Sequence, residues 1–262
     1  MNRASQITKV TLPAVWSPQL RNRRAVDVYL PSSYDESRDR YPVLYMHDGQ
    51  NLSDPATAFA GGTWGLLEVL ADLADDGLEV IVVGIHHRGR DRITEYSPFA
   101  DRRYGPGKGD RYVKFLASTL KPQIDRRFRT SRARDATAIL GSSMGGLISL
   151  YALIKQPRVF GAAGAMSPAF WHGDRGIFNV IGDLRSPRRT PASRIYLDMG
   201  TEEGAVALRD ARAMADGLER AGWGESLLWV EEPGGRHTEH DWSRRLGRAI
   251  TFLLPFTAAG RA

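Results

Sequence analysis

The chain has 262 residues, of which 42% are apolar and 25% are charged, and it contains no cysteine. This length suits one α/β domain that buries about 75% of the surface its unfolded chain exposes. The lack of cysteine excludes disulfides, thiol nucleophiles and thiolate metal sites. The net charge of +6 comes from 36 basic residues interleaved with 30 acidic ones along the whole chain, which is typical of a solvated surface and gives no nucleic-acid recognition motif.

Short β-branched and aromatic runs alternate with segments of helical periodicity along the chain. Strands are predicted at 7–15, 25–30, 42–46, 79–85, 136–140, 162–166, 195–199 and 226–230, and helices at 64–73, 110–128, 145–155, 205–221 and 238–254. This alternation predicts parallel strands, right-handed crossovers and helices on both faces of a sheet. We therefore expect a single three-layer α/β domain over residues 1–262, with a mostly parallel central sheet of about eight strands.

Residues 86–109 interrupt this alternation. The segment is longer than most connections and rich in Arg, Gly and Pro, so we expect it to be either functional or mobile. It follows a strand, and the loops after strand C-termini carry the reactive groups in such sheets. We interpret it as a loop insertion on the substrate side of the domain.

The N-terminal segment has Lys9 and Pro13 where a signal peptide needs an unbroken apolar core. The longest apolar run, around residues 80–85, is far shorter than the ~20 residues that span a bilayer. We therefore expect a soluble, cytoplasmic protein with no membrane partner.

The most informative motif is G-x-S-x-G at residues 141–145, with a predicted strand before it and a predicted helix after it. This is the context of a nucleophile elbow, where the serine stands clear of the sheet on a tight turn and its neighbours at ±2 must be nearly free of side chains. Gly141 and Gly145 meet this need around Ser143, whereas Ser142 would need a small residue at Leu140. A phosphate loop would need a different glycine and lysine pattern, which is absent. The motif predicts Ser143 as nucleophile and the Met144 N–H, at a helix start, as an oxyanion donor.

A serine nucleophile needs a base, and in this arrangement the base comes late in the chain, after an acid. His237 lies between a predicted strand and the last helix, whereas His240 lies one helical turn further and is interpreted as a surface or supporting histidine. A zinc site at HTEH lacks the H-E-x-x-H spacing and an obvious third ligand, so we expect no metal and no cofactor.

The acid is expected after the preceding strand, where LDMGTEEG supplies two glutamates. We choose Glu203 to hold the His237 tautomer, with Glu202 as the alternative. Asp198 falls inside the strand and is expected to point into or along the sheet. The second oxyanion donor should follow the third strand, where Gly49 would let the backbone approach closely and the Gln50 N–H would complete the site; an ordinary Asp-Gly turn is the alternative.

These motifs resemble the putative-esterase (esterase D-like) branch of the α/β-hydrolases, and the segments that carry the resemblance are YMHDGQNL, EYSPF, GSSMGG, LDMGTEEG and GGRHTEHDW. That branch includes feruloyl, acetylxylan and siderophore esterases, S-formylglutathione hydrolases and mycolyltransferases. The resemblance runs from roughly residue 24 to residue 255. It implies the α/β-hydrolase fold, Ser143 as nucleophile, His237 as base, an acid within 201–203, and oxyanion N–H groups from Gln50 and Met144. Two departures are Ser53, where relatives often carry Phe, and the acid, which is often Asp.

The sequence thus predicts a serine esterase that forms an acyl-enzyme on a small or medium ester of acetyl, feruloyl or siderophore type; an acyltransferase with the same triad is the alternative. Arg88 and Arg92 are candidates to bind an anionic part of the substrate, although a loop salt-bridged to its own Asp91 and Glu95 is the competing interpretation. Trp171 and His172 are candidates for a pocket wall, although a buried Trp is equally ordinary in a core.

Overall fold

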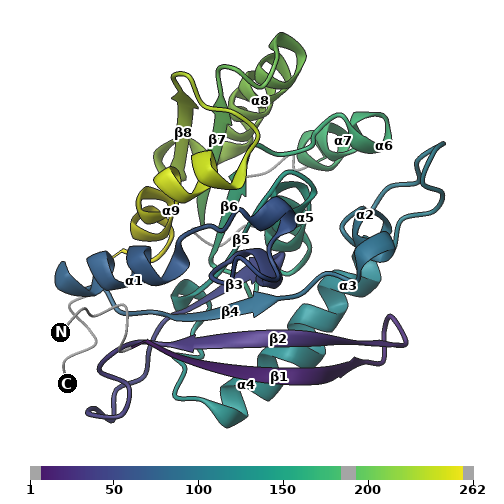
Figure 1. The fold of residues 1–262 in the computed structure, drawn as a ribbon. Helices are drawn as coiled ribbons and strands as arrows, with labels where there is room; N and C mark the ends of the chain where they lie inside the picture. The colour runs from purple at the N-terminus through teal and green to yellow at the C-terminus, as the bar shows by residue number, and fades with distance from the viewer. Residues whose placement is uncertain (1–6, 184–192, 256–262) are drawn as a thin grey trace.

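The computed structural model describes residues 7–183 and 193–255 and places one eight-stranded sheet at the centre of the molecule (Figure 1). The strands are β1 (Thr8–Ser17), β2 (Asn22–Leu30), β3 (Val43–His47), β4 (Ile81–Ile85), β5 (Thr137–Ser142), β6 (Ala162–Met166), β7 (Arg194–Gly200) and β8 (Leu227–Glu232). Their order is β1-β2-β4-β3-β5-β6-β7-β8. Pairing is antiparallel for β1–β2 and β2–β4 and parallel elsewhere, so the predicted mostly parallel sheet of about eight strands is confirmed.

Helices cover both faces of this sheet. They are α1 (Leu66–Asp75), α2 (Arg92–Glu95), α3 (Gly109–Phe115), α4 (Lys121–Arg127), α5 (Met144–Lys155), α6 (His172–Arg175), α7 (Ile177–Gly182), α8 (Ala205–Leu218) and α9 (Glu239–Leu253). One apolar core joins the sheet to α3, α4, α5, α7 and α8, and a second joins the other face to α1 and α9 (Figure 1). The central strands are buried on both faces, which explains why they read as continuous apolar runs.

The prediction of one uninterrupted helix over 110–128 is wrong. Between α3 and α4 the chain makes a π-helical turn at Leu116–Leu120, which ends two residues before Pro122. Proline has no N–H to donate, and its ring clashes with the carbonyl four residues earlier, so the helix widens there. The short helices α2, α6 and α7 were not predicted because they are too brief to show a period.

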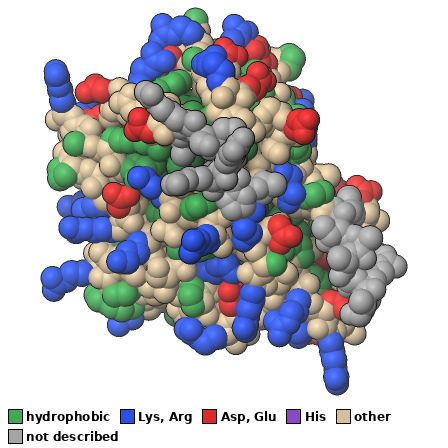
Figure 2. All heavy atoms as spheres, turned by 180° about the vertical axis from the view of Figure 1, so that it is seen from behind, with side chains coloured by type: hydrophobic (Ala, Val, Ile, Leu, Met, Phe, Trp, Pro, Cys, Tyr) green, Lys and Arg blue, Asp and Glu red, His purple; other side chains and the backbone are tan. Residues whose placement is uncertain are grey.

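The surface carries the charge in the manner expected from the sequence. On the face seen in Figure 2, Lys and Arg side chains are scattered, with Asp and Glu side chains between them, rather than gathered in one stripe. Within the segments described, no helix has the length and apolar character needed to cross a bilayer.

Candidate active site

Ser143 lies between the end of β5 and the start of α5, in a backbone conformation that non-glycine residues rarely adopt (φ 56°, ψ −121°). Such a conformation costs of order 1–3 kcal/mol and persists only where the surroundings hold it. Here the Ser143 N–H donates to the Met166 carbonyl at 2.9 Å, and the Ser143 carbonyl accepts from Ala169 N at 3.0 Å and Leu147 N at 3.1 Å. The elbow predicted from G-x-S-x-G is therefore present and firmly held.

Close packing requires glycine at position 141 and leaves little room for a side chain at Gly145. A Cβ on Gly141 would lie 2.8 Å from the Gly145 carbonyl carbon and 2.8 Å from His47 Cδ2, and a Cβ on Gly145 would lie 3.2 Å from His47 Cβ. His47 is the last residue of β3. The elbow therefore packs directly against the strand end from which the predicted oxyanion loop departs.

The predicted oxyanion loop, residues 48–50, is held in place by an ion pair and by close backbone packing at a glycine. Asp48 has a left-handed backbone (φ 56°), and its carboxylate accepts two hydrogen bonds from Arg92, from Nε and Nη2, each at 2.8 Å. Burial alone would raise the pKa of Asp48, but the Arg92 guanidinium outweighs it and lowers that pKa below its ordinary value. Gly49 follows, and a Cβ there would lie 2.5 Å from the Gly84 carbonyl carbon, so the loop crosses β4 in backbone contact.

The two predicted oxyanion donors come from this loop and from the elbow. Met144 is the first residue of α5, so its N–H has no acceptor within the helix. Gln50 precedes Asn51, whose N–H makes the first hydrogen bond of the short 3-10 turn by donating to Asp48 O. Gln50 is fixed on two sides, because its carbonyl accepts from Thr57 Oγ1 at 2.7 Å and its Oε1 accepts from His87 N at 3.3 Å. Their joint action on one oxyanion stays a prediction.

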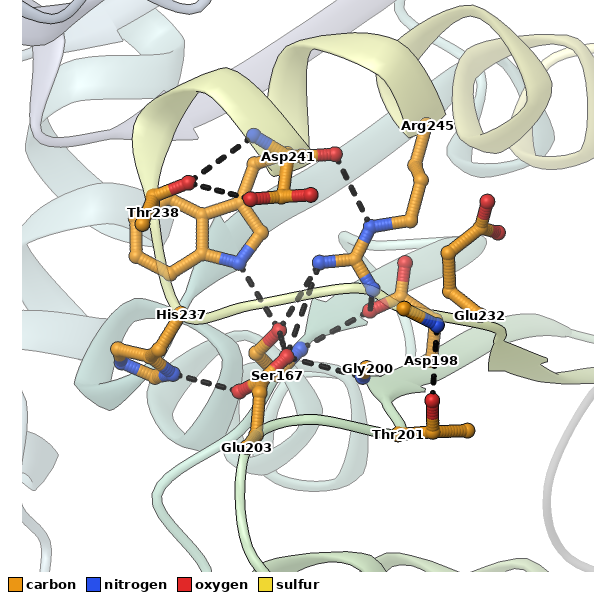
Figure 3. Close-up of polar contacts among 12 residues, drawn as sticks. Ser167, Asp198, Gly200, Thr201, Glu203, Glu232, His237, Thr238, Asp241 and Arg245 are labelled. Atoms are coloured by element: carbon orange, nitrogen blue, oxygen red, sulfur yellow. Dashed lines mark hydrogen bonds and ion pairs between the residues drawn. The ribbon is translucent and has the colours of Figure 1, made fainter.

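The structure brings His237 and Glu203 together: His237 Nδ1 lies 2.6 Å from Glu203 Oε2 (Figure 3). Glu202, the alternative acid, instead pairs with Arg236 on the surface at 2.6 Å. Burial would raise the pKa of Glu203, but hydrogen bonds from His237, Ser167 and the Gly200 N–H lower it overall, so the carboxylate stays ionised. An ionised carboxylate can only accept, which assigns the proton to Nδ1 and leaves the Nε2 lone pair free, as a general base requires.

Sequence reasoning missed a buried group behind Glu203. Ser167 Oγ lies 2.6 Å from Glu203 Oε1 and accepts from Trp242 Nε1 at 2.9 Å and Arg245 Nη2 at 3.1 Å. Asp198, expected to point into or along the sheet, is fully buried and pairs with Arg245 at 3.0 Å. The one sequence signal was an Asp inside an apolar strand, since a buried carboxylate needs a cation or several donors.

Hydrogen bonds and one peptide link connect the elbow to the acid and the base. Ser143 N donates to Met166 O, the next residue is Ser167, and the Ser167 hydroxyl reaches Glu203, which holds His237. All these groups follow the C-terminal ends of neighbouring parallel strands. The direct contact between Ser143 Oγ and His237 Nε2 stays a prediction.

The two predicted arginines are engaged in ion pairs. Arg88 Nη1 donates to a backbone carbonyl at 2.9 Å, and its Nε lies 3.5 Å from Asp91. Arg92 pairs with Asp48, and Glu95 pairs with the buried Arg24 at 2.9 Å. Of the two acids expected to form ion pairs within this loop, Asp91 pairs with Arg88, whereas Glu95 pairs with Arg24 outside the loop.

Trp171 and His172 follow β6, just after Ala169, whose N–H donates to the Ser143 carbonyl at 3.0 Å. The Trp171 side chain is exposed, with 55% of its surface accessible, whereas His172 is buried beside Tyr104 at 5.8 Å between ring centroids. In the described part of the chain neither ring nitrogen of His172 has a hydrogen-bond partner, and burial lowers its pKa. Trp171 is therefore a surface aromatic and His172 a buried one, and their place in a pocket wall stays a prediction. His240 is exposed on α9, as expected.

Comparison with known families decides the class of protein. The family model described as "Putative esterase" matches residues 17–253, a span that includes Ser143, Glu203 and His237. The chain belongs to the putative esterase family. It is a carboxylic-ester hydrolase.

Curated relatives of this esterase have modest identity. It is 25% identical over 249 residues to the uncharacterized protein YbbA of Bacillus subtilis, covering 88% of this chain and 92% of that one. It is 26% identical over 230 residues to the endo-1,4-beta-xylanase/feruloyl esterase of Xylanibacter ruminicola, covering 82% of this chain but only 29% of that protein. It is 29% identical over 178 residues to the siderophore triacetylfusarinine C esterase of Aspergillus fumigatus, covering 63% and 59% of the two chains.

Solved structures agree on the fold. The BES protein of Bacillus cereus superposes with a TM-score of 0.76 at 17% identity over 96% of both chains. A ferulic acid esterase superposes with a TM-score of 0.72 at 22% identity, covering 95% of this chain and 98% of that one. These likenesses, together with the mostly parallel sheet, establish the α/β-hydrolase fold that the sequence predicted.

Proposed function

We propose that this esterase cleaves carboxylic esters through a Ser143–His237–Glu203 triad and an acyl-enzyme. The observation that carries the proposal is the 2.6 Å hydrogen bond between His237 Nδ1 and the ionised Glu203, at the sheet edge where Ser143 occupies a nucleophile elbow. The order of these groups along the chain, serine then acid then histidine, is that of α/β-hydrolases.

In the first step the Ser143 Oγ–carbon bond forms as the hydroxyl proton passes to His237 Nε2. The negative charge that develops on the carbonyl oxygen is stabilised by the N–H groups of Gln50 and Met144, each worth about 3–4 kcal/mol. The tetrahedral intermediate then expels the alcohol, which takes its proton from His237. Water, activated by the same histidine, hydrolyses the acyl-enzyme and restores Ser143.

Substitution of Ser143 tests this function. We expect Ser143→Ala to abolish hydrolysis of p-nitrophenyl acetate and labelling by a fluorophosphonate, while the thermal unfolding curve stays close to that of the native protein. Wild-type turnover by the variant would refute the assignment.

We further propose that the substrate is a small or medium ester of acetyl, feruloyl or siderophore type. Support comes from the relatives named as feruloyl and siderophore esterases, and from the exposed Trp171 beside the buried His172, near the elbow. The insertion at 86–109 supplies Arg88 and Arg92 at the same sheet edge. Relative kcat/KM on a panel of acetyl, feruloyl, thioester and catecholate esters tests this proposal; equal rates on all four would contradict it.

A further inference from the structure

Glu203 rests on a polar cluster sealed inside the protein. Ser167 and Arg245 are each 1% exposed and Asp198 is fully buried, although two of the three are ordinarily charged. Ser167 follows β6, Asp198 lies in β7 and Arg245 comes from α9, so three elements converge behind the carboxylate (Figure 3). Burying an ion pair is expensive and stabilises little by itself, so this cluster calls for another explanation.

The direction of each hydrogen bond in the cluster follows from its chemistry. The Trp242 indole and the Arg245 guanidinium can only donate, and both lie within hydrogen-bond distance of Ser167 Oγ, at 2.9 and 3.1 Å. With both lone pairs of the hydroxyl occupied, its own proton must point elsewhere. The remaining neighbour is Glu203 Oε1 at 2.6 Å, so Ser167 is a donor with a fixed orientation.

The backbone of Ser167 is fixed as firmly as its hydroxyl. Its φ of 43° is in the left-handed region, and its N–H donates to Asp198, to the carbonyl at 3.1 Å and to Oδ1 at 3.0 Å. Asp198 in turn holds Arg245 Nη1 at 3.0 Å, and Arg245 Nε donates to the Asp241 carbonyl at 3.2 Å. Asp198 thus acts as the counterion that lets Arg245 stay buried.

We propose that Ser167 and Arg245 are positioning residues for the acid of the triad, a role that rests on the proposed function. Ser167 donates to one oxygen of Glu203 and leaves the other, Oε2, facing His237 Nδ1. Arg245, with Nη2 3.8 Å from Glu203 Oε1, adds positive charge on the side away from the histidine. Together they fix the plane of the carboxylate and keep it ionised.

The consequence is measurable in Ser167→Ala. Without the hydroxyl, Glu203 Oε1 keeps the hydrogen bond from the Gly200 N–H at 2.9 Å and the longer ion pair with Arg245 at 3.8 Å, so the carboxylate is held less firmly toward His237. We expect kcat to fall about 10- to 100-fold, the value of one hydrogen bond to a charged group, with KM changed less than about twofold. The charged groups that face Glu203 are His237, Arg245 and Asp198. The Ser167 hydrogen bond lowers the pKa of Glu203, so its loss should raise that pKa and move the acid limb of the kcat/KM profile, where the carboxylate becomes protonated, to higher pH.

The chain offers a matched control in Ser193, which is buried and whose Oγ accepts from Trp223 Nε1 at 3.2 Å. Ser193→Ala, like Ser167→Ala, leaves a buried indole N–H without its acceptor, but Ser193 makes no contact with Glu203. Both variants should lower the unfolding temperature, Ser167→Ala by more because it also removes the contacts to Arg245 and Glu203, and only Ser167→Ala should change kcat and the pH profile. If Ser167→Ala is unstable, Ser167→Gly, which suits the positive φ, gives the same readouts.

A double-mutant cycle with Glu203→Gln completes the test, measured as acylation rates at high enzyme concentration. If Ser167 acts through Glu203, removing its hydroxyl in the Glu203→Gln background should change the rate less than about threefold. An equal loss in both backgrounds, or a Ser167→Ala enzyme as fast as Ser193→Ala, overturns the positioning role. If Glu203→Gln alone has no effect, the triad itself is wrong, which is a different failure.

Discussion

Replacing Glu203 by Gln should disable the base by reversing its tautomer. In the native site Glu203 Oε1 accepts from Gly200 N and Ser167 Oγ, and Oε2 faces His237 Nδ1. A glutamine side chain has one oxygen. If that oxygen points toward Gly200 and Ser167, it accepts hydrogen bonds from both; if the amide is flipped, its NH2 group faces these two donors and both hydrogen bonds are lost. The first orientation directs the amide NH2 at His237 Nδ1, which must then accept, so the proton moves to Nε2, where the base needs a lone pair.

The magnitude follows from this geometry. An amide in place of the triad acid leaves the histidine in place but in the wrong tautomer, a change that costs about 10⁴-fold in kcat elsewhere, or about 5 kcal/mol of transition-state stabilisation. Because two of the three hydrogen bonds survive, the free energy of unfolding should fall by only about 1–2 kcal/mol. KM for p-nitrophenyl acetate should change little, since Glu203 faces the histidine and the cluster behind it.

The assay is steady-state hydrolysis of p-nitrophenyl acetate, with Glu202→Gln as the control. Glu202 is the adjacent carboxylate and pairs with Arg236 at the surface, where both side chains are about half exposed or more, so its loss should leave kcat within twofold. The reasoning would be refuted by a Glu203→Gln enzyme within tenfold of the native rate, or by an equal loss in both variants.

Three further predictions concern the surroundings of the triad. Arg92→Gln leaves the buried Asp48 without its cation, so the free energy of unfolding should fall by about 3 kcal/mol in urea titrations; a selective loss of activity on anionic esters with unchanged stability would instead assign Arg92 to substrate binding. Gly49→Ala places a Cβ 2.5 Å from the Gly84 carbonyl carbon, so we expect a shifted oxyanion loop, a loss of at least tenfold in kcat and a lower unfolding temperature, and native values of both would contradict the close approach. Trp171→Ala removes an exposed ring, so stability should change by less than about 1 kcal/mol while KM rises for aryl esters more than for acetyl esters; equal KM changes would remove Trp171 from the pocket wall.

The fold could be predicted largely from local signals. The strand predicted at 162–166 has the observed bounds of β6, because a short apolar run between turns has little room to shift. The break between α3 and α4 was missed, although Pro122 marks it, because the apolar stripe continues on both sides of the π turn. Periodicity reports the buried face of a helix and says little about its local winding.

The elbow could be predicted more firmly than the acid. A Cβ on Gly141 would lie 2.8 Å from the Gly145 carbonyl carbon, so part of the geometry is set within the motif itself. Between Glu202 and Glu203 the sequence has no such constraint. The choice is made by the turn after β7, where Glu202 N donates to Gly235 O and the Gly200 N–H holds Glu203, and the first of these contacts joins residues more than thirty positions apart.

The partners of the buried Asp198 behind Glu203 could not be predicted from the sequence. Asp198 in an apolar strand signals that some cation must be buried with it, but the chain offers 36 basic residues. Arg245 is selected because α9 begins just after His237 and carries Trp242 and Arg245 three residues apart, on the face that meets Ser167. One helix therefore begins just after the base and carries the two side chains, Trp242 and Arg245, that hold Ser167 against the acid. Glu203 and Ser167 follow β7 and β6 instead, so a displacement of α9 would shift His237, Trp242 and Arg245 relative to the acid, and the hydrogen bonds between these elements are what hold the site together.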